Sequence, residues 1–100
     1  FALSCRQVSL AFFLALLEFY GKECPHCVRM MPLVEQLEKE LGVEVKKLET
    51  WHDEGNNKLR AQKDADNMCG GVPFFVNEET GARLCGAVEY ETLKAWATGK

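Results

Sequence analysis

The residues best suited to chemistry are the two cysteines of the sequence Cys24-Pro25-His26-Cys27. Thiols separated by two residues can close a small disulfide and open it again, so the spacing suits reversible dithiol–disulfide exchange. A helix is predicted to begin here, because proline is favoured at the first helical position, where the amide it lacks would be unpaired. The positive end of that helix, with a protonated His26, would stabilise a thiolate on Cys24. We therefore expect Cys24 to attack and Cys27, one turn further on, to act as the resolving thiol.

The same spacing is also half of a zinc site, so metal binding is the main alternative. A tetrahedral site needs two further ligands, but the sequence has no second closely spaced pair, since His52, Cys69 and Cys85 are isolated. A metal or an iron–sulfur cluster held between two copies of the chain by Cys24 and Cys27 stays open as a third interpretation. We expect no resident metal and no other cofactor.

The hydrophobic pattern predicts the elements that would position the cysteines. Residues 14–20 are apolar, contain aromatic side chains and end at Gly21, which is typical of a buried strand. The helix that follows is expected to end at Gly42 and to be kinked by Pro32. Its apolar positions recur at steps of three and four, so the buried face is expected to hold Cys27, Met31, Val34, Leu37 or Glu38, and Leu41.

Strands and helices alternate along the rest of the chain. In a strand predicted over residues 43–50, Val43 and Val45 would face one side of the sheet and Leu48 the other. The alternation closes on a hairpin and indicates a small α/β sandwich. The other expected elements are a polar surface helix over 53–68, antiparallel strands over 72–76 and 82–85, and a final amphipathic helix through Tyr90, Leu93 and Ala97 with Trp96 beside its face.

Composition and charge narrow the class of protein. Hydrophobic residues make up 47% and charged residues 27% of the 100-residue chain, as in ordinary globular domains. The net charge is −3 with both signs interspersed, so no basic stripe indicates nucleic acid or an anionic membrane as a partner.

The longest apolar run, residues 10–17, is shorter than the roughly 20 residues of a membrane span. We interpret residues 1–13 as an N-terminal extension or first helix, with a targeting or anchor remnant as the alternative, and residues 14–100 as one domain.

Further short motifs lie before and after the cysteine pair along the sequence. They are Leu17-Glu18-Phe19-Tyr20 before Cys24, Pro32 five residues after Cys27, Lys47-Leu48, Gly71-Val72-Pro73, and Gly86-Ala87 with Leu93-Lys94. Together with the cysteines, this pattern resembles the thioredoxin superfamily over residues 14–98. The resemblance implies a thioredoxin-like α/β fold with a central mixed β-sheet flanked by helices.

The resemblance also implies roles for individual residues. Glu18 would be the buried acid six residues before the attacking cysteine, and Lys47 would lie on the strand opposite it. The Val72-Pro73 bond would be cis and would help to bind an extended substrate strand. A buried carboxylate is costly unless it is paired or protonated. We therefore expect Glu18 either to pair with Lys47 or, with a raised pKa, to accept the proton of Cys27.

The sequence departs from the family pattern next to the first cysteine. Glu23 replaces the usual tryptophan, and Pro25-His26 replaces Gly-Pro. The Pro-His dipeptide is similar to that of bacterial periplasmic disulfide oxidases, and a short N-terminus with such a dipeptide also resembles glutaredoxins. The glutaredoxin contact to glutathione, Gly-x-Asp-Asp, is poorly reproduced by Ala87-Val88-Glu89.

The resemblance predicts a monomeric thiol–disulfide oxidoreductase that exchanges disulfides or dithiols with protein substrates. Its electron donor would be a thiol reductase or glutathione. Two alternatives stay open: a glutaredoxin-like, glutathione-dependent reductase, and a non-catalytic module that docks partners through Val72 and Pro73 or holds a metal. The compartment is also open, with the cytoplasm, a plastid or a secretory lumen all compatible with the apolar N-terminal run.

The remaining candidates carry weaker expectations. The five cysteines are an odd number, so at least one thiol cannot pair within the chain. Cys69, four residues before Pro73, is interpreted as an inert packed cysteine, with a regulatory thiol as the alternative. No expectation is attached to Cys5. The other assignments are Cys85 in the core of a strand, His52 on the surface beside Trp51, and Phe74 and Phe75 in the core.

Overall fold

A computed structural model describes residues 16–99 of the chain. The segment 1–13, interpreted from the sequence as an extension or first helix, lies outside the described residues, as does Cys5. No helix in the described part is long and apolar enough to cross a membrane. The elements are β1 (Leu16–Tyr20), α2 (Pro25–Leu41), β2 (Lys46–Glu49), α3 (Glu54–Lys63), β3 (Phe74–Asn77), β4 (Arg83–Cys85) and α4 (Tyr90–Thr98).

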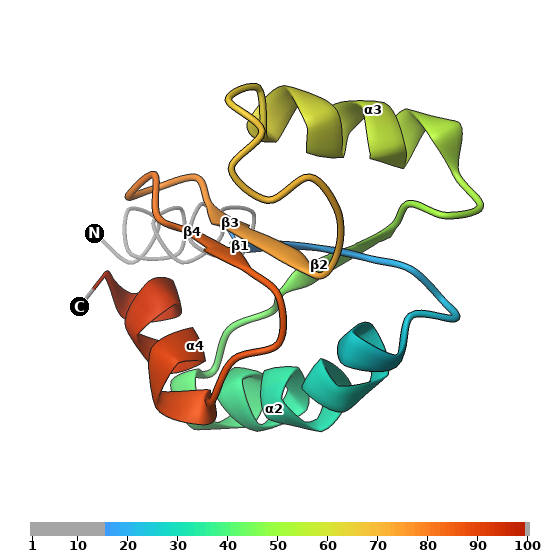
Figure 1. Ribbon diagram of the computed structural model, residues 1–100. Helices are drawn as coiled ribbons and strands as arrows, with labels where there is room; N and C mark the ends of the chain where they lie inside the picture. Colours follow the sequence, from blue (N-terminus) through green and yellow to red (C-terminus); the bar gives the residue numbers. More distant parts are fainter. Residues whose placement is uncertain (1–15, 100) are drawn as a thin grey trace, which may run out of the picture.

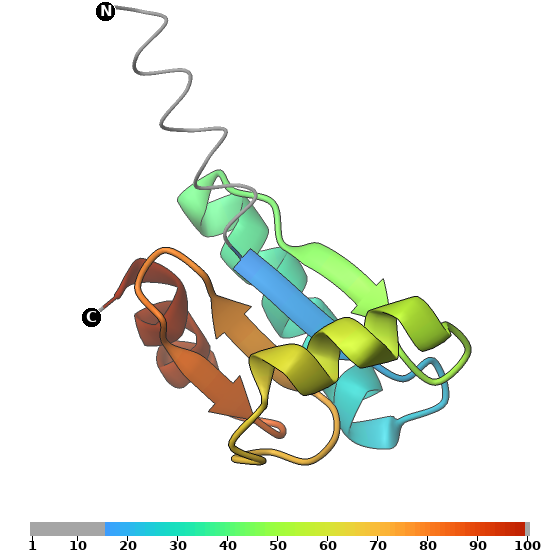
Figure 2. The same cartoon turned by 90° about the horizontal axis from the view of Figure 1, so that it is seen from above.

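The four strands form one mixed sheet in the order β2-β1-β3-β4. β1 runs parallel to β2, and β3 is antiparallel to both β1 and β4. Helices α2 and α4 cover one face of the sheet, and α3 covers the other (Figure 1). Seen from above, α3 lies across the strands (Figure 2). The arrangement confirms the predicted α/β fold with a mixed sheet flanked by helices.

Alternation along β1 divides the core into two clusters, because successive strand residues point to opposite faces. Leu16 belongs to the cluster between the sheet and helices α2 and α4, while Leu17 and Phe19 belong to the cluster beneath α3. The first cluster also contains Met30, Val34, Leu37, Val45, Phe75, Leu93, Trp96 and Ala97, and the second also contains Phe74 and Val76. Phe74 and Phe75 are therefore core residues, as predicted.

Helix α2 has the predicted ends but a slightly different buried face. It follows Cys24 and is capped by Gly42 in the left-handed conformation, with φ of 66°. The buried side chain is Met30 rather than Met31, which is 55% exposed. Both positions fit a helical step of three or four from Cys27. Contacts with the sheet and α4 select Met30, whose Sδ lies 3.4 Å from the Val88 amide nitrogen.

The final helix α4 has the predicted extent, whereas β2, α3, β3 and β4 are shorter than the sequence predicts. Val43 and Val45 do lie with the α2 and α4 cluster and Leu48 with the α3 cluster, although the paired strand covers only Lys46–Glu49. The polar helix ends at Lys63 instead of near residue 68. It stops there because Asp64 turns its carboxylate to accept the backbone N–H groups of the following turn, at Cys69 and Gly70.

Candidate active site

The two cysteines of the Cys-Pro-His-Cys motif lie where the sequence predicts, at the start of α2. Cys24 is the N-cap residue and Cys27 lies in the first turn, and both are free thiols with at most 4% of their surface exposed. The Cys24 N–H donates to the Gly21 carbonyl at 3.0 Å, and the Cys24 carbonyl accepts from the Val28 N–H at 3.0 Å. This turn and the first helical hydrogen bond fix the backbone that carries both sulfur atoms.

The surroundings of Cys27 keep its thiol protonated. Burial is the largest cause that raises its pKa, to about 12, and only the Gly21 N–H, which donates to Sγ at 3.4 Å, acts in the opposite direction. The hydrogen bond with Cys24 and the charges of Cys24 and Glu18 raise the pKa further. A base is therefore required before Cys27 can act as a nucleophile.

Glu18 is the candidate for this base, because it is the carboxyl whose charge acts on Cys27. Its side chain points from β1 toward α2 and is 3% exposed. Burial raises the pKa of the Glu18 carboxyl to about 7, against a lowering by the charge of Lys47 and a further rise from Glu38. The carboxyl borders a cavity of about 170 Å³, lined also by Tyr20, Met31, Glu35 and Lys47, which is large enough to admit water. The site can thus hold a proton near neutral pH.

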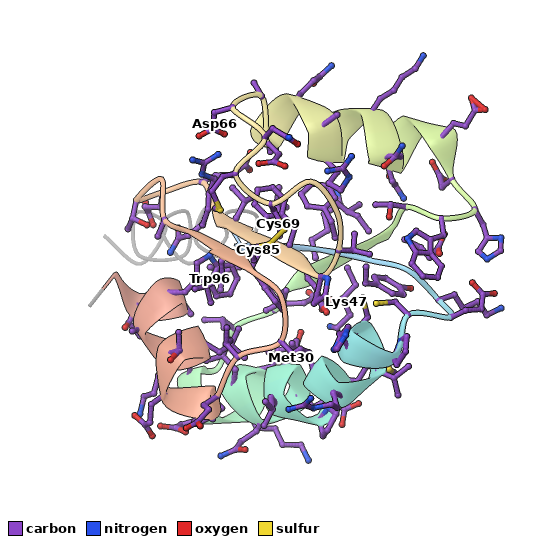
Figure 3. All side chains as sticks on the ribbon, viewed as in Figure 1. Met30, Lys47, Asp66, Cys69, Cys85 and Trp96 are labelled. Carbon is purple, nitrogen blue, oxygen red and sulfur yellow. A yellow bond between two sulfur atoms is a disulfide. The ribbon has the colours of Figure 1, made fainter. Side chains whose placement is uncertain are left out.

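Lys47 takes its expected place in the sheet but not its expected partner. It pairs with Glu18 in the register of β1 and β2, yet its ammonium forms an ion pair with Glu38 of α2, with Nζ and Oε2 2.8 Å apart. Of the two alternatives for Glu18, the ion pair with Lys47 is therefore not the one that the described residues form. The Lys47 side chain extends from β2 to the partly hydrated surface beside α2, where its charge loses less solvation than it would against a buried carboxyl (Figure 3).

The Val72-Pro73 peptide bond is cis, which confirms the prediction drawn from the resemblance. Phe74 pairs with Phe19 near the end of β1, so Pro73 lies at the same end of the sheet as Gly21 and the cysteine turn. Within the described residues, neither the N–H nor the C=O of Val72 has a hydrogen-bond partner. These groups are free to pair with another strand.

No protein-family model and no curated protein sequence matches the chain. Solved structures do match: a mutant thioredoxin from Halobacterium salinarum NRC-1 is 24% identical with a TM-score of 0.64, covering 93% of this chain and 83% of that one. Thioredoxin from Aeropyrum pernix is 22% identical with a TM-score of 0.62, covering 94% and 81%. Mitochondrial thioredoxin 3 from Saccharomyces cerevisiae is 16% identical with a TM-score of 0.63, covering 96% and 90%.

The protein has the thioredoxin fold. The identities to these structures establish the fold alone, and the activity of the protein depends on the residues of the site. In this thioredoxin fold, the cysteine pair and the cis-proline segment lie at one end of the sheet, and the buried acid lies in the middle of β1.

A disulfide that the sequence pattern did not predict joins Cys69 and Cys85. Both earlier interpretations are corrected: Cys69 is neither an inert nor a free thiol, and Cys85 is an exposed residue at the end of β4 rather than a core residue. A signal was present in the predicted hairpin. Antiparallel strands over 72–76 and 82–85 bring the chain just before the first strand close to the end of the second.

Around the cysteine motif, the thioredoxin fold of this protein has a rim of polar side chains and the exposed aromatic ring of Trp51, which lies against Gly21. His26 is exposed, and Glu23 forms an exposed ion pair with His52, with Nε2 and Oε1 2.8 Å apart. This partner raises the pKa of the His52 imidazole. His52 is therefore a surface residue, as predicted, and the position of the usual tryptophan holds one half of an ion pair.

A group of three possible metal ligands lies on this rim. Donor atoms of Glu23, Glu49 and His52 lie within 4.8 Å of one another. They already have partners, because the Glu49 carboxylate accepts the backbone N–H groups of Lys22, Trp51 and His52. The three side chains therefore cluster because their contacts hold the loop beside the cysteines.

Proposed function

We propose that the protein is a thiol–disulfide oxidoreductase that acts as a monomer on protein substrates through Cys24 and Cys27. The observation that carries this proposal is the placement of two free thiols at the start of α2 beside a buried acid. A helix start stabilises negative charge on the N-cap sulfur, which suits an attacking thiolate. Cys27, whose thiol pKa is raised by burial, suits the resolving step.

In the reducing direction, the Cys24 thiolate attacks one sulfur of a substrate disulfide. The substrate S–S bond breaks, its electron pair leaves on the other substrate sulfur, and a mixed disulfide forms. Cys27 then loses its proton and attacks the Cys24 sulfur, which releases the second substrate thiolate and leaves a Cys24–Cys27 disulfide. Two electrons pass to the substrate in each turnover, and a thiol reductase or glutathione returns them to the protein.

Glu18 is proposed to accept the Cys27 proton in the second step, through water in the adjoining cavity. In the mixed disulfide Cys24 carries neither a thiol proton nor a negative charge. The hydrogen bond and charge by which Cys24 raises the pKa of Cys27 are then absent, so the proton becomes easier to remove. A carboxyl with a pKa of about 7 matches a proton acceptor that works near neutral pH.

The substrate is proposed to bind along the Val72 and Pro73 segment. The free N–H and C=O groups of Val72 can pair with an extended peptide, and this mode of binding is insensitive to most side chains. Such pairing would hold a substrate disulfide at the end of the sheet where Cys24 lies. Protein disulfides are therefore favoured over small disulfides as substrates.

A test of the proposal is the reduction of insulin by dithiothreitol, with and without the protein. The wild-type protein is expected to accelerate the reaction and Cys24→Ser to abolish the acceleration. Cys27→Ser is expected to accelerate it less, because dithiothreitol must then resolve the mixed disulfide in place of Cys27. His52→Gln, outside the cysteine pair, serves as a matched control. No acceleration by the wild type would favour a non-catalytic module, and activity only in a glutathione-coupled assay would favour the glutaredoxin-like alternative.

A further inference from the structure

The Cys69–Cys85 disulfide joins the segment proposed to bind substrate to the edge of the sheet. Cys69 lies in the loop before the cis proline, and Cys85 is the register partner of Phe74, the residue after that proline. The Cys69 sulfur lies 3.5 Å from the Gly71 carbonyl oxygen and 3.9 Å from that of Pro73. The bond therefore lies directly against the backbone of the segment (Figure 3).

This disulfide is more accessible than the cysteines of the proposed active site. Cys85 is an exposed residue and Cys69 is half-buried, whereas Cys24 and Cys27 are both buried. Thiol–disulfide exchange requires an attacking thiolate to reach a sulfur along the S–S bond, so access is one of the factors that set its rate. The position of Cys85 at the end of the edge strand β4 gives an external thiol that access.

Opening the bond would leave the two ends of the loop attached but free its middle. The Asp64 carboxylate accepts the backbone N–H of Cys69 at 3.1 Å and of Gly70 at 2.7 Å, and the Pro73 carbonyl accepts the Gly86 N–H at 2.8 Å. Between these anchors lie only Gly71 and Val72. Glycine has the largest backbone freedom of any residue. Reduction is therefore expected to loosen this segment without unfolding the domain.

We propose that Cys69–Cys85 is a second redox site that accepts electrons from small dithiols, and that its state sets how firmly the Val72 segment is held for substrate binding. The second part rests on the proposed function. A thiolate of the dithiol attacks the Cys85 sulfur, the S–S bond breaks, and its electron pair leaves on Cys69, which takes a proton from solvent. The second thiol of the dithiol then loses its proton and attacks the dithiol sulfur that is bound to Cys85. This step forms a cyclic disulfide in the reductant and releases Cys85 as a thiolate, which solvent protonates. Two electrons and two protons thus pass from the dithiol to the protein.

The first part is tested in a variant that retains only this pair, Cys5→Ser/Cys24→Ser/Cys27→Ser. The folded variant is equilibrated with mixtures of reduced and oxidised dithiothreitol, quenched with acid, alkylated and weighed by mass spectrometry. We expect one transition to two alkylated thiols while the far-ultraviolet circular dichroism stays native. Protection from the reductant until urea unfolds the chain would overturn the proposal, as would the absence of the bond from the oxidised protein. This variant lacks the proposed active site, so its result does not depend on that site.

The second part is tested by trapping mixed disulfides without any reductant. Cys27→Ser is compared with Cys27→Ser/Cys69→Ser/Cys85→Ser, which keeps nearly the same side-chain volumes but lacks the cross-link. We expect attack on the insulin disulfides to slow roughly three- to tenfold, the size expected when one or two residues must be ordered on binding. Attack on hydroxyethyl disulfide is expected to be unchanged. Equal rates for insulin, or equal slowing for both substrates, would overturn the link between this bond and substrate binding.

Discussion

Glu18 and Lys47 are direct neighbours across the parallel strands β1 and β2, yet the Lys47 ammonium forms its ion pair with Glu38 of α2. Glu18 is therefore a buried acid whose facing cation is engaged elsewhere. Burial prevails over the attraction of Lys47 and raises the pKa of the Glu18 carboxyl to about 7. A buried acid of this kind affects both stability and proton transfer, and the two effects can be measured separately.

The stability of the protein is expected to fall as the pH rises from about 4.5 to about 7, and Glu18→Gln is expected to remove that fall. The Glu18 pKa is raised from 4.5 to about 7 in the folded protein, so folding favours the protonated carboxyl. The stability contributed by this proton is complete below the unfolded pKa and is lost as the pH rises through the folded pKa. The difference corresponds to on the order of 3 kcal/mol. Urea unfolding of both proteins at acidic and alkaline pH measures it, and parallel pH profiles would contradict the prediction.

The second effect of Glu18→Gln is expected on the rate of resolution. The variant keeps the shape of the side chain but cannot accept the Cys27 proton, so the second step should slow by about 10²-fold, a usual size for general-base catalysis. The first attack by Cys24 should change little. Stopped-flow measurement separates the two steps. In the wild type the resolving rate should rise as Glu18 loses its proton near pH 7; an unchanged rate and pH profile in the variant would make Glu18 a structural residue only.

The two thiols of the motif are expected to react unequally with iodoacetamide near neutral pH. Burial raises the pKa of Cys27 to about 12, so its thiolate is scarce, whereas Cys24 lies at the helix start. Peptide mass spectrometry of briefly alkylated protein should find the label on Cys24 first. Cys24→Ser serves as the control for the residual rate at Cys27. Faster labelling of Cys27 in the wild type would reverse the assignment of attacking and resolving thiols.

His26 is expected to make the cysteine pair more oxidising. It is exposed beside Cys24, where an imidazolium charge would stabilise the thiolate and hence the reduced form. His26→Pro should therefore lower the reduction potential, as measured by equilibration with glutathione redox buffers. His26→Gln separates loss of charge from the rigidity of proline. A potential that is unchanged or higher in both variants would leave His26 without a role in tuning the pair.

The fold and the start of the active-site helix could be predicted because they depend on local patterns. The apolar strand, the proline after Cys24 and the glycine that caps α2 each act within a few residues of their own position. The buried face of α2 could not be fixed in the same way. Met30 and Met31 both fit the helical period, and the choice between them depends on where α4 packs.

Contacts between distant segments explain the other differences. The Cys69–Cys85 bond depends on the register of a hairpin. The hairpin brings the Cα atoms of the two cysteines to 5.3 Å from each other, although the residues are 16 positions apart in sequence. The partner of Lys47 depends on a helix that lies next to the strand only after folding. The hairpin predicted from the sequence indicates only that these cysteines come near each other, because its register and the packing of α2 beside β2 are fixed only in the folded chain.

The last prediction concerns Gly21. Its N–H donates to the Cys27 sulfur, and the indole ring of Trp51 packs against its backbone. A β-carbon added at Gly21 would overlap the indole ring of Trp51. Gly21→Ala is therefore expected to expel the indole and to lower the free energy of unfolding by about 1 to 3 kcal/mol, as overpacking does. In a Trp51→Ala background the same substitution should cost much less. Urea unfolding of the four proteins closes this double-mutant cycle. Equal costs in both backgrounds would mean that the indole does not rest on Gly21, and that the aromatic rim of the site is placed by other contacts.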